Sequence, residues 1–414
     1  MCIALGLGAG LGLGALAGGQ VHAGGFALQN QNGAGTGNAF AGAAAVAEDA
    51  STIYFNPAGM VLLPPGHSIS AAVTFLNRTV DYSDRGTVSV PTFPLGEDGG
   101  DGGSLAIVPA AFWSYSPDSK WAVGIGLSPT FGNVTEFDKD FIGRFSGYFA
   151  EIKQINLNPS VAYRVDDRVS VGFGLNFARN ETEFRQMAVV GAGAQRDAHL
   201  KGDDTAIGWN VGAMLQITPY TRLGFAYRSS MEFDLSGRQK IAGLLNAGIG
   251  AELETPDNAS LALHHQLSPQ WELLGDLTWT GWSKIQDIKV EGGTSPVLSY
   301  RFKDTWRVGL GVGYKLDDKW KLRAGVAFDE APVRSAEDRT MTLPDSDRSW
   351  IAFGARYALN PQTTVDLGYS HVFFDDAPTR RVATIPAGLG GRQVIRGTFD
   401  VSADLLSVQL NHHF

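Results

Sequence analysis

The chain has very little cysteine and only one long apolar run. Of its 414 residues a single one is cysteine, Cys2, so everything after it lacks the means to form a disulfide. A polytopic helical membrane protein needs several apolar runs of about 20 residues. Here one such run exists, from Ile3 to Ala17 at the extreme N-terminus. The sequence therefore excludes a disulfide-stapled domain and a bundle of membrane-spanning helices.

Charge is also scarce, and no reactive motif is present. Charged residues make up 18% of the chain, the net charge is −9, and no basic block occurs, so no nucleic-acid partner is expected. There is neither a Gly-x-Ser-x-Gly elbow nor a phosphate-binding loop. The His-His pairs at 264–265 and 412–413 cannot share one metal ion if they lie on strands, because neighbouring side chains face opposite sides. The acidic residues Asp345–Asp347 match no defined calcium-ligand pattern. We expect no catalytic, cofactor or metal site.

The N-terminus is typical of a secretory signal peptide. Ile3–Ala17 forms the apolar region, and Val21-His22-Ala23 is a small-x-small cleavage site, so residues 1–23 are expected to be removed. The mature chain then starts at Gly24 without cysteine, in an oxidising compartment. Because no Lys or Arg precedes the apolar run, the start codon is misplaced or the signal is atypical. The alternative is a retained N-terminal anchor.

Glycine is abundant, and it alternates with large apolar residues. The chain has 52 glycines, about 13% against a usual value of about 7%. Residues 24–65 are rich in Gly, Ala and Asn and show no clean period. Beyond them, Trp121–Leu127, Trp209–Ile217 and Trp306–Tyr314 each carry bulky apolar side chains on one face and small or polar ones on the other. Such alternation is typical of strands in a transmembrane β-barrel.

The spacing of short polar turns predicts the number of strands. These turns fall near positions 117, 166, 219, 268, 317 and 360, so they recur roughly every 50 residues. Each interval holds two strands of about ten residues, a tight turn and one long loop, which is the outer-membrane pattern. Six turns join twelve strands, and a first strand after Pro65 and a last one ending at Phe414 make fourteen. Terminal aromatic residues such as Phe414 are generally recognised by barrel-assembly machinery. We therefore expect an outer-membrane protein surrounded by lipid and lipopolysaccharide.

Several segments resemble the FadL family of outer-membrane long-chain fatty acid transporters. Gly24-Gly25-Phe26 is followed by AGAAAVAEDASTIYFNPAGM, and then, in the family's order, by INLNPSVAYRV, FKDTWRVGLGVGY and LPDSDRSWIAFGARY. The resemblance extends over essentially the whole mature chain. It implies an all-β fold: a fourteen-stranded antiparallel transmembrane barrel at 66–414 with an N-terminal plug, or hatch, at 24–65. It also implies passive uptake of long-chain fatty acids or other hydrophobic small molecules.

Apolar residues in two long loops are candidates for ligand capture. Extracellular loops are normally polar, so such residues suggest a groove. They are Met187, Val189 and Val190 in the third loop and Ile241, Leu244, Leu245 and Ile249 in the fourth. The resemblance implies that these two loops form an initial low-affinity site. The alternative is that they pack on each other. In the second loop, four phenylalanines at four-residue spacing from 137 to 149 predict one stripe of a short helix, used first for loop packing.

The resemblance also implies an inner pocket and a gate. In the pocket, Phe26 is the aromatic residue near the mature N-terminus, and Lys303 and Arg185 are the basic residues near the ligand headgroup. The alternative for Lys303 is pairing with Asp304 or another acidic residue of the lumen. In the plug, the gate is the motif Asn56-Pro57-Ala58. The corresponding break in the third strand falls at Pro129, Phe131 and Gly132, because proline cannot donate to the ladder; alternatively, Pro129 only ends that strand at the rim.

Two other functions remain open from the sequence. A general aqueous porin would need an open lumen, which a plug at 24–65 argues against, and a barrel lipase is not excluded by fold alone. Within the family resemblance, some members pass aromatic hydrocarbons such as toluene. For those ligands a headgroup cation would be dispensable.

Overall fold

The protein is a closed antiparallel β-barrel of fourteen strands, as the turn spacing predicts. The structure is a computed structural model that describes residues 25–89, 93–294, 296–385 and 391–414, so the predicted signal peptide lies outside the described residues. Each strand pairs with its neighbour in chain order, and the last pairs with the first, with Val408 opposite Val73. The barrel strands are β1 (Gly66–Asp84), β2 (Leu105–Ser116), β3 (Trp121–Glu136), β4 (Phe149–Arg164), β5 (Val169–Gly191), β6 (Ala194–Thr218), β7 (Thr221–Arg228), β10 (Asn258–Gln266), β11 (Trp271–Thr280), β14 (Thr305–Lys315), β15 (Trp320–Asp329), β16 (Arg348–Asn360), β17 (Thr363–Phe374) and β19 (Arg392–His413).

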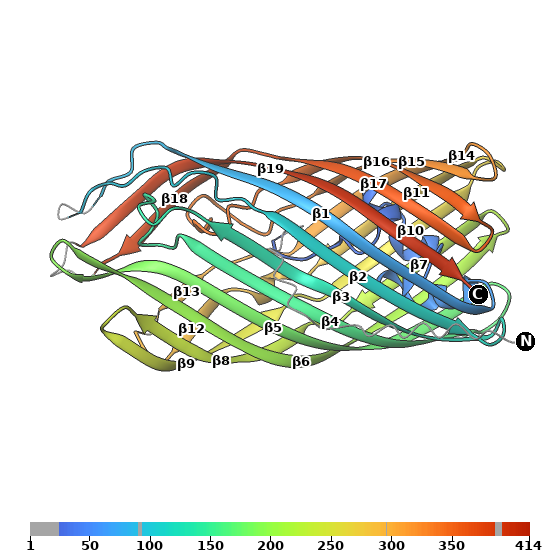
Figure 1. The fold of residues 1–414 in the computed structure, drawn as a ribbon, viewed down its shortest axis with the longest axis horizontal. Helices are drawn as coiled ribbons and strands as arrows, with labels where there is room; N and C mark the ends of the chain where they lie inside the picture. The colour runs from blue at the N-terminus through green and yellow to red at the C-terminus, as the bar shows by residue number, and fades with distance from the viewer. Residues whose placement is uncertain (1–24, 90–92, 295, 386–390) are drawn as a thin grey trace, which may run out of the picture.

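The remaining strands extend the wall at the end where the long loops lie (Figure 1). The hairpin of β8 (Met231–Ile241) and β9 (Leu245–Thr255) continues the wall beside β6. The short strands β12 (Asp287–Glu291) and β13 (Val297–Ser299) pair with each other, and β18 (Ala377–Thr384) pairs with β19. The predicted tight turns all lie at the opposite end, where short turns face the periplasm in barrels of this class.

The alternation in each strand separates a lipid-facing surface from the lumen. On β3, Trp121 is 50% exposed whereas its neighbour Ala122 is fully buried. Near the short turns, cross-strand Trp–Tyr ring pairs with centroids 4.5–4.6 Å apart lie at similar levels, as in the aromatic girdle of an outer-membrane barrel. These pairs are Trp121–Tyr163, Trp271–Tyr314 and Trp320–Tyr357.

The first described segment lies inside the barrel, toward the short-turn end (Figure 1). We call residues 25–65 the hatch. It contains α1 (Gly33–Thr36), α2 (Ala43–Val46), α3 (Thr52–Phe55) and the 3-10 helix η1 (Pro57–Leu62). The backbone N–H of Gly33 donates to Gln409 Oε1 of β19 at 2.9 Å, and this glutamine is fully buried. No helix of the described residues is long and apolar enough to cross a membrane.

The glycines of the barrel strands make room for the hatch. A Cβ atom at Gly224 of β7 would collide with the carbonyl oxygen of Ala44, and one at Gly325 of β15 would collide with that of Asn38. In the same way, Gly212 of β6 faces the side chain of Asn56. The strands therefore alternate aliphatic residues with glycine for two reasons. The aliphatic side chains face lipid, and the glycines let the hatch backbone approach the wall.

We expect Gly224→Ala to displace the hatch from the barrel wall. The added methyl group has no space beside Ala44, and overpacking of this kind costs about 1–3 kcal/mol. Amide hydrogen exchange in residues 33–62 should rise several-fold, while heat-modifiable gel mobility still reports an assembled barrel. Gly275→Ala is the matched control, because the nearest atom to its added Cβ is Leu310 Cδ2 at 3.6 Å. Equal exchange in the two variants would contradict the role of Gly224.

Candidate functional site

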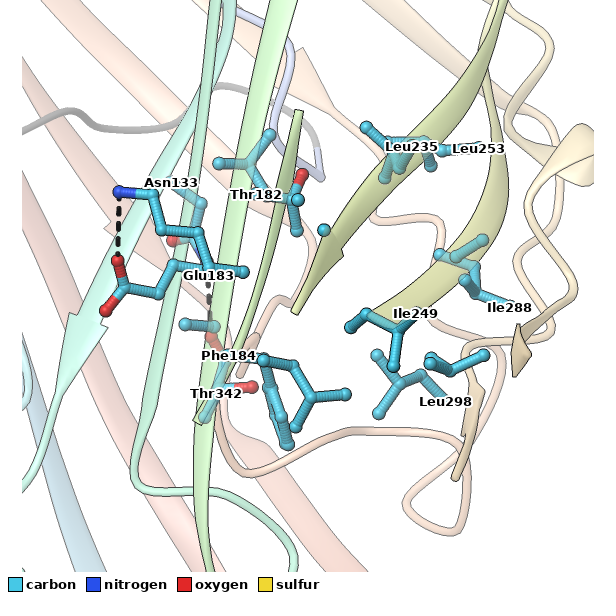
Figure 2. A pocket seen from close by; sticks show the side chains of 18 of the residues that line it. Asn133, Thr182, Glu183, Phe184, Leu235, Ile249, Leu253, Ile288, Leu298 and Thr342 are labelled. Atoms are coloured by element: carbon cyan, nitrogen blue, oxygen red, sulfur yellow. Dashed lines mark hydrogen bonds and ion pairs between the residues drawn. The ribbon is translucent and has the colours of Figure 1, made fainter. Parts of the chain in front are cut away.

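An apolar cavity lies among the strand extensions at the long-loop end. Strands β5 and β6 form one side of it, and the β8–β9 hairpin with residues 285–290 and 298–300 forms the other. Figure 2 shows Leu235, Leu253, Ile249, Ile288 and Leu298 gathered on this second side. The alternation of β8 produces this surface, since Phe233 and Leu235 are buried while the acidic residue between them, Asp234, is exposed. Phe26 of the hatch also lines the cavity.

A charged cluster borders the cavity on the β5–β6 side. Its centre is Glu183, which lies beyond Phe177, the last exposed apolar residue of β5. Glu183 lies 2.5 Å from Arg185, 3.0 Å from His199 and 3.5 Å from Lys201. Burial alone would raise the pKa of Glu183, but the hydrogen bond from Arg185 and the nearby cations outweigh burial and hold the pKa below its usual range. Glu183 and Lys201 line the cavity, so its apolar surface ends at a charged margin.

Four aromatic rings, one of them from the hatch, pack together at the inner end of the cavity. Phe26 meets Trp282 edge-on with centroids 5.0 Å apart, and it meets Phe131 of β3 at 6.0 Å. Trp282, in the 3-10 helix η2 (Trp282–Lys284), also meets Phe302 at 5.9 Å. Edge-to-face packing of this kind is favourable and fixes each ring against its neighbours. We call these four residues the aromatic septum.

Strands β2 and β3 separate part-way along the wall. Their ladder runs from Tyr115↔Val123 to Ala111↔Leu127 and stops there, so residues 105–110 and 128–136 do not pair with each other. Strand β3 stays bonded to β4, but its register shifts between Pro129 and Phe131. At the long-loop end of the separation, where β3 ends, the N–H of Glu136 donates to the carbonyl of Gly102 at 3.1 Å. We call the unpaired stretch the wall gap.

The start of the hatch covers the wall gap from within. Leu28 N–H donates to the carbonyl of Thr130 and Gly132 N–H donates to that of Phe26, both at 2.8 Å. The side chain of Gln31 donates to the carbonyl of Pro129 at 2.7 Å. Residues 26–28 therefore pair with β3 around an isolated antiparallel bridge between Ala27 and Phe131, and we call this segment the hatch strand. Residues 128–135 of β3 are all buried, in contrast to the alternating exposure of residues 121–127.

The rest of the hatch is held to the wall by the motif that begins at Asn56. Its Nδ2 lies 2.7 Å from the carbonyl of Ala44, and 3.1 and 3.2 Å from those of Ala213 in β6 and Phe225 in β7. Its Oδ1 accepts from Ala58 N–H at 3.1 Å, and Pro57 begins η1. The motif thus fastens the body of the hatch to two neighbouring strands.

A buried ionic network makes the second attachment. Glu48 of the hatch contacts Lys321, Arg323 at 2.5 Å and Arg356 at 3.2 Å. Asp366 of β17 pairs with the same two arginines at 2.7 and 2.9 Å. We call this set the hatch anchor. It joins α2–α3 to three strands, so the body of the hatch is fixed at several points whereas the hatch strand is held by only a few hydrogen bonds and the septum.

Comparison with known proteins identifies the family. The family model "Outer membrane protein transport protein (OMPP1/FadL/TodX)" matches residues 14–414. The chain belongs to this family. It is 29% identical to Outer membrane protein P1 of Haemophilus influenzae, over 96% of this chain and 97% of the relative. It is 27% identical to the Long-chain fatty acid transport protein of Escherichia coli K12, over 85% and 88%. The crystal structure of a Pseudomonas aeruginosa FadL homologue matches with a TM-score of 0.87 and 25% identity, over 95% of this chain and all of that one. As a member of the OMPP1/FadL/TodX family, the protein is an integral outer-membrane transporter and not an enzyme.

The residues predicted for ligand contact are dispersed in this family member. Phe26 and Ile249 line the cavity. Ile241 is buried and Leu244 is 64% exposed, and together with Leu245 they lie at the tip of the β8–β9 hairpin. The residues predicted for the third loop also lie apart from the cavity. Met187 is buried in the aromatic core of the second loop, and Val189 packs against that core. Val190 is partly exposed.

The two predicted headgroup cations also lie apart from each other. Arg185 pairs with Glu183, and its guanidinium stacks 4.7 Å from the centre of the Phe149 ring. Lys303 is half-buried and forms no ion pair within the described part of the chain. The neighbouring carboxylate of Asp304 instead accepts the N–H of Ser283 at 2.9 Å. Neither cation lines the cavity, whereas Lys201 does.

The short helix predicted at 137–149 is wrong. The segment is a series of turns, and Phe149 begins β4. Gly147 has a positive φ of 132°, and Arg144 donates to several loop carbonyls, which fixes these turns instead of a helix. The predicted packing role is nevertheless clear, because all four phenylalanines share one buried cluster.

The acidic residues Asp345–Asp347 are engaged by the protein itself. Asp345 accepts the N–H of Gly25 at 2.8 Å and pairs with Arg348 at 2.9 Å. Asp347 accepts the N–H of Ala331 at 2.7 Å. No group of three metal-ligating side chains that could hold an ion occurs among the described residues.

Sequence reasoning missed the Glu183 cluster and the hatch anchor. Alternation does place Glu183, Arg323 and Asp366 on particular faces of their strands. It does not reveal which inward-facing charges from different strands meet, because those contacts depend on barrel closure and on the path of the hatch.

Proposed function

We propose that the protein takes up long-chain fatty acids passively and releases them sideways through the wall gap into the outer membrane. The observation that carries this proposal is the separation of β2 from β3, where the hatch strand pairs with β3 from inside the barrel. The name of the Escherichia coli relative, Long-chain fatty acid transport protein, supports fatty acids as the ligand class.

The energetics favour a lateral path over an axial one. Each CH₂ group kept in water costs about 0.8 kcal/mol, so a long acyl chain gains little from an aqueous lumen. An axial path would also cross the body of the hatch with its buried charges, whose separation is expensive. Through the wall gap, the chain moves from an apolar cavity to lipid without long contact with water.

The cavity provides complementary sites for the two ends of a fatty acid. The acyl chain would lie against Leu235, Ile249 and Leu253, and the carboxylate would lie toward Lys201 and Arg185. A charge-assisted hydrogen bond is among the stronger polar contacts. Lys303 remains a proposed headgroup partner nearer the septum. The apolar residues at 187–190 and 241–245 remain proposed points of first capture.

The hatch strand is the proposed gate. Moving it requires breaking the hydrogen bonds to β3 and displacing Phe26 from the aromatic septum. The body of the hatch, fastened by Asn56-Pro57-Ala58 and the hatch anchor, stays in place. In this account Pro129 and Gly132 shape the gap, and Phe131 closes it.

An aromatic hydrocarbon is the second candidate ligand. The septum and the apolar side of the cavity would suit such a molecule, and no cation would be needed. Uptake of labelled oleate and labelled toluene by a transporter-deficient host expressing the protein separates the two ligands. We expect oleate to accumulate well above the empty host. Accumulation of toluene alone would contradict the fatty-acid proposal.

We expect Lys201→Met to weaken the binding of oleate by up to about fivefold. The limit reflects the half-exposed position of this lysine, where an ion pair contributes about 0.2–1 kcal/mol. Binding of oleyl alcohol should be unchanged, because it carries no charge. Lys240→Met, which removes an exposed lysine of β8, is the matched control. Equal losses for oleate and the alcohol would show that Lys201 does not act on the headgroup.

A further inference from the structure

A second cavity lies beyond the aromatic septum, between the hatch and strands β6, β7, β10, β11 and β14. We call it the inner chamber. Ala27 and Phe131 line it, so it adjoins both the hatch strand and the septum. Its volume is about 100 Å³, whereas a polar cavity needs only roughly 10–15 Å³ to hold one water molecule. The chamber therefore has room for a small polar group.

The inner chamber contains a buried cation without a counter-ion. Arg228 of β7 lines it and is only 6% exposed. The guanidinium donates to Asn176 Oδ1 and, at 2.9 Å, to the carbonyl of Tyr54. Both acceptors are neutral, and no carboxylate within the described ranges lies within 4.0 Å of it. The other cation of the chamber, Arg307, is already paired with Asp276 at 3.0 Å, which leaves a net charge of one positive unit.

A second donor in the chamber also lacks a partner. Asn210 is 2% exposed, and its Oδ1 accepts from the side chains of Asn158 and Asn176 at 2.9 and 3.0 Å. These two bonds fix which end of the amide is oxygen. Its Nδ2 then has no hydrogen-bond partner. An unpaired buried donor is costly, and so is a buried charge without a counter-ion.

We propose that the inner chamber binds the carboxylate of an amphiphile that has passed the septum. One carboxylate oxygen would accept from Arg228 and the other from Asn210 Nδ2. Such a ligand supplies both the negative charge and the acceptor that the chamber lacks. The inference rests on the proposed function and deepens it, since the chamber becomes a transient headgroup site between the outer cavity and release into the membrane. An uncharged ligand such as an alcohol could supply an acceptor but not the negative charge.

Arg222 offers a matched comparison with Arg228. It lies on the same strand and donates to the hatch carbonyls of Ala45 and Val46, both at 2.6 Å. It does not line the chamber. Removing Arg222 therefore tests the loss of a hatch attachment alone, whereas removing Arg228 removes one attachment and the chamber's unpaired charge.

The test compares uptake of labelled oleate and labelled oleyl alcohol by a transporter-deficient host. For Arg228→Met we expect oleate uptake to fall at least tenfold and alcohol uptake to change less than twofold. Arg222→Met should affect the two probes equally. Arg228→Lys, which keeps the charge, should restore at least a third of the oleate uptake, and Asn210→Ala should lower it two- to fivefold. Heat-modifiable mobility confirms barrel assembly in each variant.

Two outcomes overturn the inner-chamber proposal. Equal losses of oleate and alcohol uptake in Arg228→Met would mean that this arginine only holds the hatch, and no loss would mean that the chamber binds no carboxylate. Failure of the proposed function gives a different result, because wild type would then take up no oleate. If the Arg228→Met variant does not assemble, the Asn210→Ala variant provides the test. Unchanged oleate uptake by Asn210→Ala would then overturn the proposal.

Discussion

A disulfide between positions 27 and 131 should abolish uptake of oleate, and reduction should restore it. Ala27 and Phe131 form an antiparallel bridge flanked by the hydrogen bonds of Leu28 and Gly132. They are therefore a non-hydrogen-bonded pair, for which the Cα atoms lie about 4.5 Å apart. This separation is within the range of a disulfide, about 4.4–6.8 Å. The double variant Ala27→Cys/Phe131→Cys would lock the hatch strand over the wall gap.

The chain suits this experiment because its one cysteine, Cys2, lies in the predicted signal peptide. The single variants Ala27→Cys and Phe131→Cys are the controls for loss of the native side chains, and neither should respond to a reductant. Binding of oleate to the outer cavity should persist in the oxidised protein, since Ala27 and Phe131 do not line it. Equal uptake by the oxidised and reduced double variant would rule out movement of the hatch strand as the gate.

Glu48→Ala should loosen the body of the hatch without dismantling the barrel. Glu48 is the carboxylate through which the hatch meets Lys321, Arg323 and Arg356. Without it Lys321, Arg323 and Arg356 each lose a carboxylate partner, and breaking a buried pair costs about 3–5 kcal/mol. Amide exchange in residues 33–62 should rise by one to two orders of magnitude. Ion conductance in planar bilayers should appear, because water then reaches the space that the hatch fills.

The matched control is Glu254→Ala, which removes a carboxylate from a partly exposed pair with Lys284. A pair of that kind contributes about 0.2–1 kcal/mol, so neither exchange nor conductance should change. If Glu48→Ala behaves like this control, the network does not hold the hatch. The hatch would then not divide into a fixed body and a moving hatch strand.

The number of barrel strands could be predicted because both of its signals are local. Alternation within segments such as Trp121–Leu127 reports one lipid-facing side, and the polar turns report where the chain reverses. Each depends on a few neighbouring residues and on the solvent around them. The same alternation predicts the glycines on the opposite face of each strand, but it does not predict what they are for. Only the path of the hatch shows that Gly224 and Gly325 accommodate backbone.

The site was less predictable because its contacts join segments distant in sequence. Glu48 meets Arg323 and Arg356 only after the barrel closes around the hatch. The phenylalanines from 137 to 149 gave a helical spacing, but Gly147 and the hydrogen bonds of Arg144 dictate turns. Lys201 could not be distinguished from other loop lysines, since its place at the cavity depends on the β8–β9 hairpin folding against β6.

Photo-crosslinking with a diazirine-bearing fatty acid tests the lateral path most directly. The labelled ligand would be added to cells expressing the protein, irradiated during uptake, and the modified peptides identified by mass spectrometry. We expect labels on the cavity, then on the septum and on residues 105–110 and 128–135 that border the wall gap. Labels that instead continue through η1 and the hatch anchor to the periplasmic turns, with none at the wall gap, would contradict the lateral path.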